Sequence, residues 1–236
     1  MVEEVQAALQ QVSSTEKAVN SARFFKTGPA QYGEGDLFIG VTVPEQRKIA
    51  KAYFRPILFK DLQRLLKSPI HEERLTALLM MVLKFQKGNE VTRRAVFDLY
   101  MEEIEHINNW DLVDSSAPYI VGPWLDGNVY KMKVLTRLAQ SEVLWERRIA
   151  MLATFYFIHK CRRADEALEI IDILLLDQHD LIQKAVGWML REIGKRVSED
   201  TLLEFLNTHA HEMPRTALRY AIERLTPVQK QKYMHQ

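Results

Sequence analysis

Cysteine is almost absent from this chain, since its 236 residues include only Cys161. One thiol excludes an intramolecular disulfide framework and a cysteine-rich metal site, and it is typical of a reducing compartment, so we expect a cytoplasmic protein. We interpret Cys161 as a packing residue or a half-exposed residue at a helix end. No apolar run reaches the roughly 18 residues of a transmembrane helix, and the early Glu3 and Glu4 are unlike a signal peptide. We therefore expect no membrane contact.

Glycine and proline are also scarce, with nine and eight residues. The helix-favouring residues Leu, Ala, Glu, Lys, Arg and Gln are abundant, and no segment has the alternation of a convincing strand. The sequence therefore predicts an all-α fold with one long breaker-rich loop, residues 28–36. The expected helices are 2–12, 14–26, one that opens at 42–44, 59–66, 72–86, 92–104, 111–121, 129–140, 144–160, 164–175, 181–197, 198–207, 214–225 and 227–236.

No charge of either sign dominates, because 32 Lys and Arg residues face 31 Asp and Glu residues for a net charge of +1. This balance predicts no general attraction to nucleic acid, so any basic surface must come from the arrangement of charges. One such arrangement is the helix that opens at Thr42, with Pro44 in its first turn. Its polar face would present Gln46, Arg47 and Lys51.

The helices recur with a period of roughly 30 to 40 residues, the length of a two-helix repeat. Four copies have a charged residue, then a small residue three positions later, then an apolar run, and a weaker copy stands at residues 215–217. The small residues are Ala77, Ala117, Ala150, Gly187 and Ala217. We predict helix pairs stacked into a solenoid, with all 236 residues in one domain, the small residues at close helix contacts and the charged ones, such as Arg74, along one groove. The alternative is an irregular helical bundle with chance matches.

Common catalytic signatures are missing. The seven histidines show no HExxH motif or paired ligand spacing, and we expect His106 and His159 at helix ends. No glycine-rich phosphate loop and no GxSxG motif is present. We therefore expect neither a metal nor a cofactor.

Carboxylates, tryptophans and arginines remain as candidates. Trp110 and Asp114 lie four residues apart in the opening turns of a predicted helix, which puts them on one face. Asn108 as N-cap and Asp111 at the third position would resemble a capping box, which gives Asp111 a structural explanation. Asp114 lies beyond the cap, and the alternative to a catalytic role is a salt bridge to a neighbouring helix, for example to Arg148.

A second candidate helix carries Trp188 between Lys184 and Arg191, which share its face. Two cations beside an indole suit a nucleic-acid backbone, where the cations bind phosphates and the ring meets a sugar or base. The alternative for Trp188, as for Trp110, is a large core residue.

Three segments, 109–115, 145–150 and 182–192, resemble the HEAT-like DNA glycosylases of the DNA alkylation repair family. Weaker matches at 22–26 and 38–47 extend the likeness over most of the chain. The resemblance implies a right-handed superhelical solenoid of HEAT-like helix pairs whose concave face grips duplex DNA. It also implies a monomeric enzyme of base excision repair that releases positively charged purines such as 3-methyladenine and 7-methylguanine.

By position, the resemblance makes Asp114 the catalytic carboxylate, Trp110 and Trp188 the indoles around the lesion's deoxyribose, and Arg148 the cleft arginine. Phe24 stands where typical members carry a tyrosine, which puts one polar contact in doubt. With these we expect contacts to alkylated double-stranded DNA from Phe24, Arg47, Arg148, Lys184 and Arg191.

The residues suit this chemistry, because a purine alkylated at N3 or N7 is already cationic and leaves as a neutral base without a general acid. One carboxylate is then enough to stabilise the oxocarbenium-like sugar and to orient water. Two indole faces would add cation–π attraction of about 0.5 to 2 kcal/mol. An open groove has no deep pocket for an extruded base, so we expect recognition through backbone, sugar and lesion charge.

Two other functions fit the same scaffold. A non-catalytic binder of distorted or branched DNA would not need the carboxylate and the indoles together. A peptide-binding helical repeat would suit the near-zero net charge.

Overall fold

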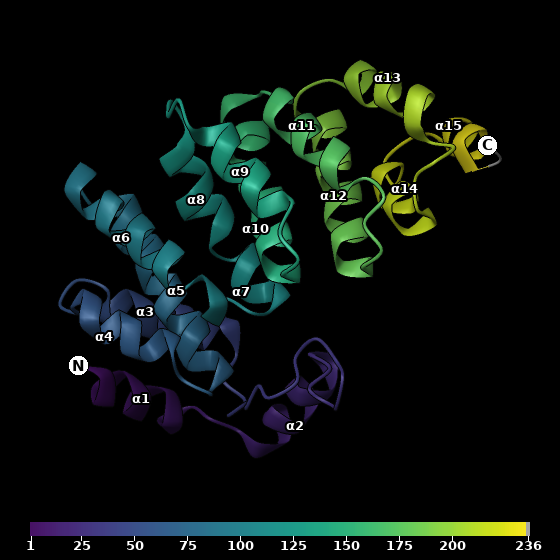
Figure 1. The fold of residues 1–236 in the computed structure, drawn as a ribbon. Helices are drawn as coiled ribbons and strands as arrows, with labels where there is room; N and C mark the ends of the chain where they lie inside the picture. The colour runs from purple at the N-terminus through teal and green to yellow at the C-terminus, as the bar shows by residue number, and fades with distance from the viewer. Residues whose placement is uncertain (235–236) are drawn as a thin grey trace. The chain divides into compact units, whose positions relative to one another are not determined.

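The computed structural model describes residues 1–234, which are almost entirely helical (Figure 1). The described residues contain no strand, only an isolated parallel bridge between Leu37 and Ile70. No helix among them is long and apolar enough to span a membrane. The helices are α1 (Val2–Gln11), α2 (Thr15–Phe24), α3 (Val43–Tyr53), α4 (Phe59–Leu66), α5 (His71–Lys87), α6 (Glu90–Glu102), the 3-10 helix Ile104–His106, α7 (Trp110–Asp114), α8 (Ala117–Leu125), α9 (Lys131–Ala139), α10 (Leu144–Ala153), the π-helix Phe157–Cys161, α11 (Asp165–Leu174), α12 (Asp180–Arg196), α13 (Glu199–His209), α14 (Arg215–Ala221) and α15 (Pro227–Met234). The all-α prediction is confirmed, and the predicted last helix ends in two residues outside the described range.

The chain forms two compact units, Met1–Ile120 and a second that begins at Val121. In the first unit α5 is the central helix and packs against α1, α3, α4, α6 and α7. Its residues from His71 to Val82 are all buried. Residues 77–82 are all apolar, as expected of a central helix, whereas the first turn is polar and is stabilised by the hydrogen bonds described below. The prediction of a single domain stays a prediction.

In the second unit the successive second helices of the predicted repeats lie side by side, with α12 packed against both α10 and α14 (Figure 1). A Cβ atom added at Gly187 would lie 2.3 Å from the carbonyl oxygen of Ala217 and 2.5 Å from the Cβ of Tyr220. The prediction that a small residue lies at a close helix contact is therefore confirmed at Gly187. The same pattern occurs at Gly122, where an added Cβ would lie 2.4 Å from the carbonyl oxygen of Ala153.

Two segments were each predicted as one continuous helix, and both predictions were wrong because the helix is interrupted within the segment. The helix predicted at 111–121 is α7 and α8, with a turn at residues 115–116. Pro118 explains this break, since a continuous helix would require its missing N–H and would place its ring against the carbonyl of Asp114. The helix predicted at 144–160 ends at Ala153 and continues as the π-helix, which stops at Arg162 with a φ of 55°.

The start of α3 is confirmed, with Thr42 and Glu45 forming a capping box. Its predicted polar face needs one correction. Arg47 and Lys51 are exposed, but Gln46 is buried and donates from Nε2 to the carbonyl oxygen of Val41 at 2.8 Å. An amide can be buried in this way because its hydrogen bond compensates for the lost water.

Candidate functional site

The short helix α7 carries both Trp110 and Asp114, as the sequence predicted. The N-cap prediction was wrong by one residue, because the Asn109 side chain, not that of Asn108, accepts a hydrogen bond from the Trp110 N–H at 2.8 Å. Asp111 is therefore at the second helical position. Trp110 and Asp114 are both half-buried.

Asp114 lines a pocket of about 520 Å³ in the first unit. The floor is apolar, formed by Ala50, Phe54, Leu79, Val82, Leu83 and Tyr119. The other charged residues of the lining are all basic, namely Arg47, Lys51, Arg55 and Lys87. Within residues 1–234, none of these four cations has an ion pair. One carboxylate thus shares a pocket with four cations that are available to an anionic ligand.

A buried hydroxyl pair lies close to Asp114. Tyr100 of α6 is fully buried, and its hydroxyl is 3.0 Å from the Oγ of Ser116. Burial raises the pKa of Tyr100, and the negative charge of Asp114 raises it further. Tyr100 is therefore a neutral hydrogen-bonding group, and it links α6 to the turn that follows Asp114.

Trp110 belongs to a column of aromatic rings. Its indole stacks on Phe25 at 5.2 Å between ring centroids, Phe25 stacks on Phe38 at 5.1 Å, and Phe38 stacks on the imidazole of His71 at 4.6 Å. Phe24 meets Trp110 edge-on at 5.8 Å and is 65% exposed. Position 24 therefore still carries an aromatic ring although the tyrosine hydroxyl is missing, and the exposed side of the Phe24 ring can contact a ligand.

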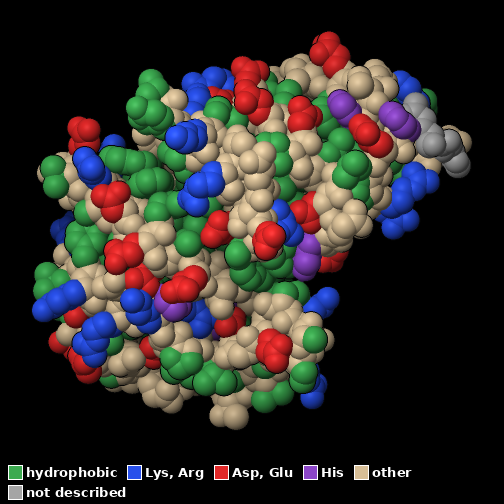
Figure 2. Space-filling view, in the orientation of Figure 1, with side chains coloured by type: hydrophobic (Ala, Val, Ile, Leu, Met, Phe, Trp, Pro, Cys, Tyr) green, Lys and Arg blue, Asp and Glu red, His purple; other side chains and the backbone are tan. Residues whose placement is uncertain are grey.

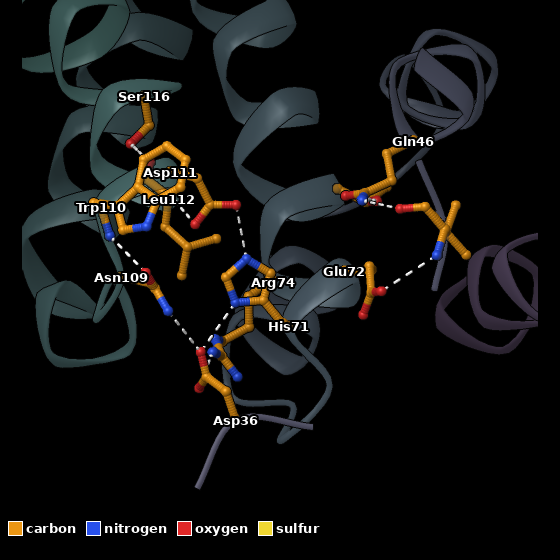
Figure 3. A network of polar contacts seen from close by, with 12 residues as sticks. Asp36, Gln46, His71, Glu72, Arg74, Asn109, Trp110, Asp111, Leu112 and Ser116 are labelled. Atoms are coloured by element: carbon orange, nitrogen blue, oxygen red, sulfur yellow. Dashed lines mark hydrogen bonds and ion pairs between the residues drawn. The ribbon is translucent and has the colours of Figure 1, made fainter. Parts of the chain in front are cut away.

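A buried polar network lies at the base of this column (Figure 3). The Nδ1 atom of His71 is 3.0 Å from Asp36, and its Nε2 atom is 2.8 Å from Asp111. Burial alone would lower the pKa of His71, but the charges of Asp111 and Asp36 and their hydrogen bonds outweigh it and raise the pKa to about 9. His71 is therefore a buried cation at neutral pH.

Two further residues complete the network. Arg74 donates to Asp36 at 2.5 Å and to the carbonyl oxygen of Ser68 at 2.9 Å, and Asn109 donates to Asp36 at 3.1 Å. Burial raises the pKa of Asp36, but the hydrogen bond from His71 and the charge of Arg74 outweigh it and lower the pKa. The prediction that Arg74 lines a groove was wrong, because only 4% of this residue is exposed.

Sequence reasoning missed this network because its members are up to 73 residues apart in the chain. One signal was present. His71 opens α5, whose segment from residue 77 to 83 is entirely apolar, and a histidine that is buried requires polar partners.

In the second unit, Trp188 lies on α12 beside Phe155, with ring centroids 6.0 Å apart. The two cations predicted on its face both have acidic partners. Lys184 lies 2.8 Å from Asp180, and Arg191 is paired with Glu223. Phosphate binding by either cation would have to compete with these carboxylates.

Arg148 on α10 is buried, with 5% of its surface exposed. Its Nη1 atom donates to the carbonyl oxygen of Leu181 at 2.5 Å, which fixes the guanidinium to the start of α12. Its neighbour Arg147 pairs with Asp177 at 2.7 Å. On the face drawn in Figure 2, acidic and basic side chains are interspersed, in keeping with the net charge of +1.

The prediction for Cys161 at a helix end is confirmed, since it is half-buried at the last position of the π-helix. Its Sγ is 3.5 Å from Asp126. Burial and the charge of Asp126 raise the pKa of the thiol, which makes it a poor nucleophile. Among the described residues, no group of three or more His, Cys, Asp or Glu side chains is arranged to hold a metal ion.

Comparison with known proteins identifies a family and a similar fold. The profile of a family described as DNA alkylation repair enzyme matches residues 5–225. Among solved structures, the chain is similar to one described as a predicted DNA alkylation repair enzyme from Enterococcus faecalis, with 17% identity, a TM-score of 0.70, and coverage of 91% of this chain and 97% of that chain. At this identity the structural likeness shows the fold alone. No match to a curated protein was found.

Proposed function

The chain belongs to the DNA alkylation repair enzyme family, and on this premise we propose that it is a monofunctional DNA glycosylase. Membership makes it an enzyme of DNA alkylation repair. The proposed reaction is hydrolysis of the N-glycosidic bond of N3- or N7-alkylated purines, such as 3-methyladenine and 7-methylguanine, in duplex DNA.

The observation that carries this proposal is the composition of the pocket around Asp114. Four cations line this pocket, Arg47, Lys51, Arg55 and Lys87. Because none of them has an ion pair within residues 1–234, they suit the phosphates of DNA. A carboxylate among them is costly for plain DNA binding, since phosphates repel it. The cost is offset if the bound site on DNA is itself positive, as an alkylated purine is. Asp114 therefore selects for a cationic lesion as well as for the transition state.

Hydrolysis by this site requires few groups. The C1′–N bond breaks with its electron pair moving to the purine, which leaves as a neutral base. Positive charge then develops on the deoxyribose, and Asp114 stabilises it and accepts a proton from the attacking water. The half-buried indole of Trp110, held by its ring column, packs against the sugar and adds cation–π attraction of about 0.5 to 2 kcal/mol.

The second unit contributes through α10 and α12 in this proposal. Trp188 supplies the second indole for the sugar, and Lys184 and Arg191 contact phosphates after exchanging their carboxylate partners. Arg148, fixed to the Leu181 carbonyl, supplies a positive charge that requires no reordering on binding.

The decisive experiment measures bases released from methylated duplex DNA, by chromatography, with the wild type and with Asp114→Asn. We expect the wild type to release methylated purines and the variant to be slower by about a hundredfold or more, the usual effect of removing one transition-state contact. DNA affinity should be kept or increased, because a charge that repels phosphates is lost.

Asp98→Asn is the matched control, because Asp98 is an exposed carboxylate of α6 paired with Arg94 at 3.6 Å. It should release base at the wild-type rate. An Asp114→Asn variant as fast as this control would contradict the catalytic role. Retention of DNA by a wild type that releases no base would instead support the non-catalytic binder.

A further inference from the structure

The buried network below Trp110 joins three parts of the chain: the segment before α3, the start of α5 and the start of α7. His71 donates to two carboxylates from different parts of the chain, Asp36 in the segment before α3 and Asp111 in α7. Asp36 in turn accepts from Asn109, whose side-chain oxygen accepts from the Trp110 N–H. The backbone of Trp110 is thus two hydrogen-bonded residues away from the imidazole.

The same imidazole also supports the Trp110 side chain. It stacks on Phe38, which stacks on Phe25, which stacks on the indole at an interplanar angle of 18°. His71 therefore lies at the end of two independent connections to Trp110, one through hydrogen bonds and one through rings. An interaction made twice in this way fixes both the backbone and the ring plane.

We propose that His71 is a positioning residue for the active site: by joining Asp36 to Asp111 and supporting the Phe38–Phe25 column, it sets the start of α7 and the plane of the Trp110 indole. The part of this inference that concerns base release rests on the proposed function, whereas the part that concerns Trp110 does not.

Three charged side chains form the ion pairs around His71: Asp36, Asp111 and Arg74. Asp36 and Asp111 face its two nitrogens, and Arg74 of the same helix neutralises Asp36 from the other side. The adjacent acidic residues of α5 point elsewhere. Glu72 accepts from the backbone N–H groups of residues 39–41, and Glu73 accepts from Gln6. Among the described residues, the imidazolium is thus the one cation that contacts both carboxylates.

The test uses full-length protein labelled with 5-fluorotryptophan, in which four fluorine signals are expected from the four tryptophans. Trp110→Phe assigns the signal of Trp110. In His71→Gln we expect that signal to shift or broaden, while those of Trp124, Trp145 and Trp188 stay in place. A folded His71→Gln protein with an unchanged Trp110 signal would overturn the proposal.

His209→Gln is the matched control. His209 also pairs with a carboxylate, Glu212 at 2.6 Å, and stacks on a phenylalanine, Phe205 at 4.5 Å. Its replacement should leave the Trp110 signal unchanged.

If His71→Gln does not fold, a pH titration of the wild-type protein tests the proposal instead. Its Trp110 signal should change as the pH rises through about 9, the pKa of His71, and a signal constant from pH 7.5 to 10 would also overturn the proposal.

The kinetic arm separates positioning from binding. In single-turnover release of 7-methylguanine at pH 7.5, His71→Gln should lower the rate constant on the order of tenfold to a hundredfold, with DNA affinity changed less than about twofold. A wild type that releases no base would refute the proposed function, yet the fluorine signals would still decide whether His71 positions Trp110. A normal rate in a folded His71→Gln variant would overturn the role of His71 in catalysis.

Discussion

The Nε2 atom of His71 lies 2.8 Å from a carboxylate oxygen of Asp111, the residue that follows Trp110. Because Asp36 faces the other ring nitrogen, both nitrogens must carry a proton to make these bonds. The two helices that meet here, α5 and α7, are therefore joined by a buried positive charge, and their stability depends on the pH at which that charge is lost.

His71 should make stability fall as the pH rises. Its pKa is about 9 in the folded chain and 6.5 as a model value, so its contribution is complete below pH 6.5, declines from 6.5 to 9, and is lost above 9. The contribution is on the order of 3 kcal/mol. Urea unfolding at pH 6 and at pH 9.5 should show the gap between wild type and His71→Gln narrowing by that order. A gap that is constant over this range would show that His71 does not titrate as described.

Gly187→Ala should destabilise the second unit. The new methyl group would lie 2.3 Å from the Ala217 carbonyl oxygen, so α12 and α14 would have to move apart, at a cost of about 1 to 3 kcal/mol. Gly194→Ala in the same helix is the control, because its methyl group would lie 2.6 Å from the end of the flexible Leu202 side chain, which can turn away. Thermal unfolding should show a lower midpoint for the first variant only. Equal midpoints would mean that the small residue is not required for this helix contact.

Arg47→Ala and Lys51→Ala should each weaken binding to duplex DNA and reduce the slope of log affinity against log salt by about one. Both residues are exposed on α3, line the pocket of Asp114 and have no ion pair among the described residues. Arg94→Ala removes an equally exposed cation that pairs with Asp98. Mobility shifts over a range of salt should find the wild-type slope in that control. A wild-type slope in both α3 variants would remove this pocket from the DNA contact.

Much of the fold follows from local sequence patterns. Apolar spacing predicted most helices to within a few residues, and the repeat of small residues predicted the close approach of two helices at Gly187. The break before α8 could also have been predicted, because Pro118 cannot continue the turn that contains Asp114. The break after Ala153 has no such marker. At this break the Thr154 hydroxyl donates to the Met151 carbonyl oxygen at 2.6 Å.

The residues of the candidate site are likewise of two kinds: some could be predicted from local spacing in the sequence, and others meet only in the tertiary structure. Trp110 and Asp114 share a face because they are four residues apart, which the sequence alone indicates. Arg47 and Lys51 were predicted together because they lie four residues apart on one face of α3. Arg55 and Lys87 were missed because they follow or end separate helices and meet only in the tertiary structure. His71 was missed for the same reason, since its acidic partners lie 35 and 40 residues away in the sequence.

The ion pair between Arg191 and Glu223 makes a last prediction about the second unit. Arg191 lies on the helix of Trp188, and 60% of the Glu223 side chain is exposed, so a phosphate could replace the carboxylate. Glu223→Gln removes the competitor, and DNA affinity should rise about two- to fivefold, the range of an exposed ion pair. Glu212→Gln makes the same change in net charge beside His209 and should raise affinity less. Fluorescence anisotropy with a labelled duplex measures both. An equal rise in the two variants would indicate a general effect of charge, and Arg191 would then lose its assigned contact with DNA.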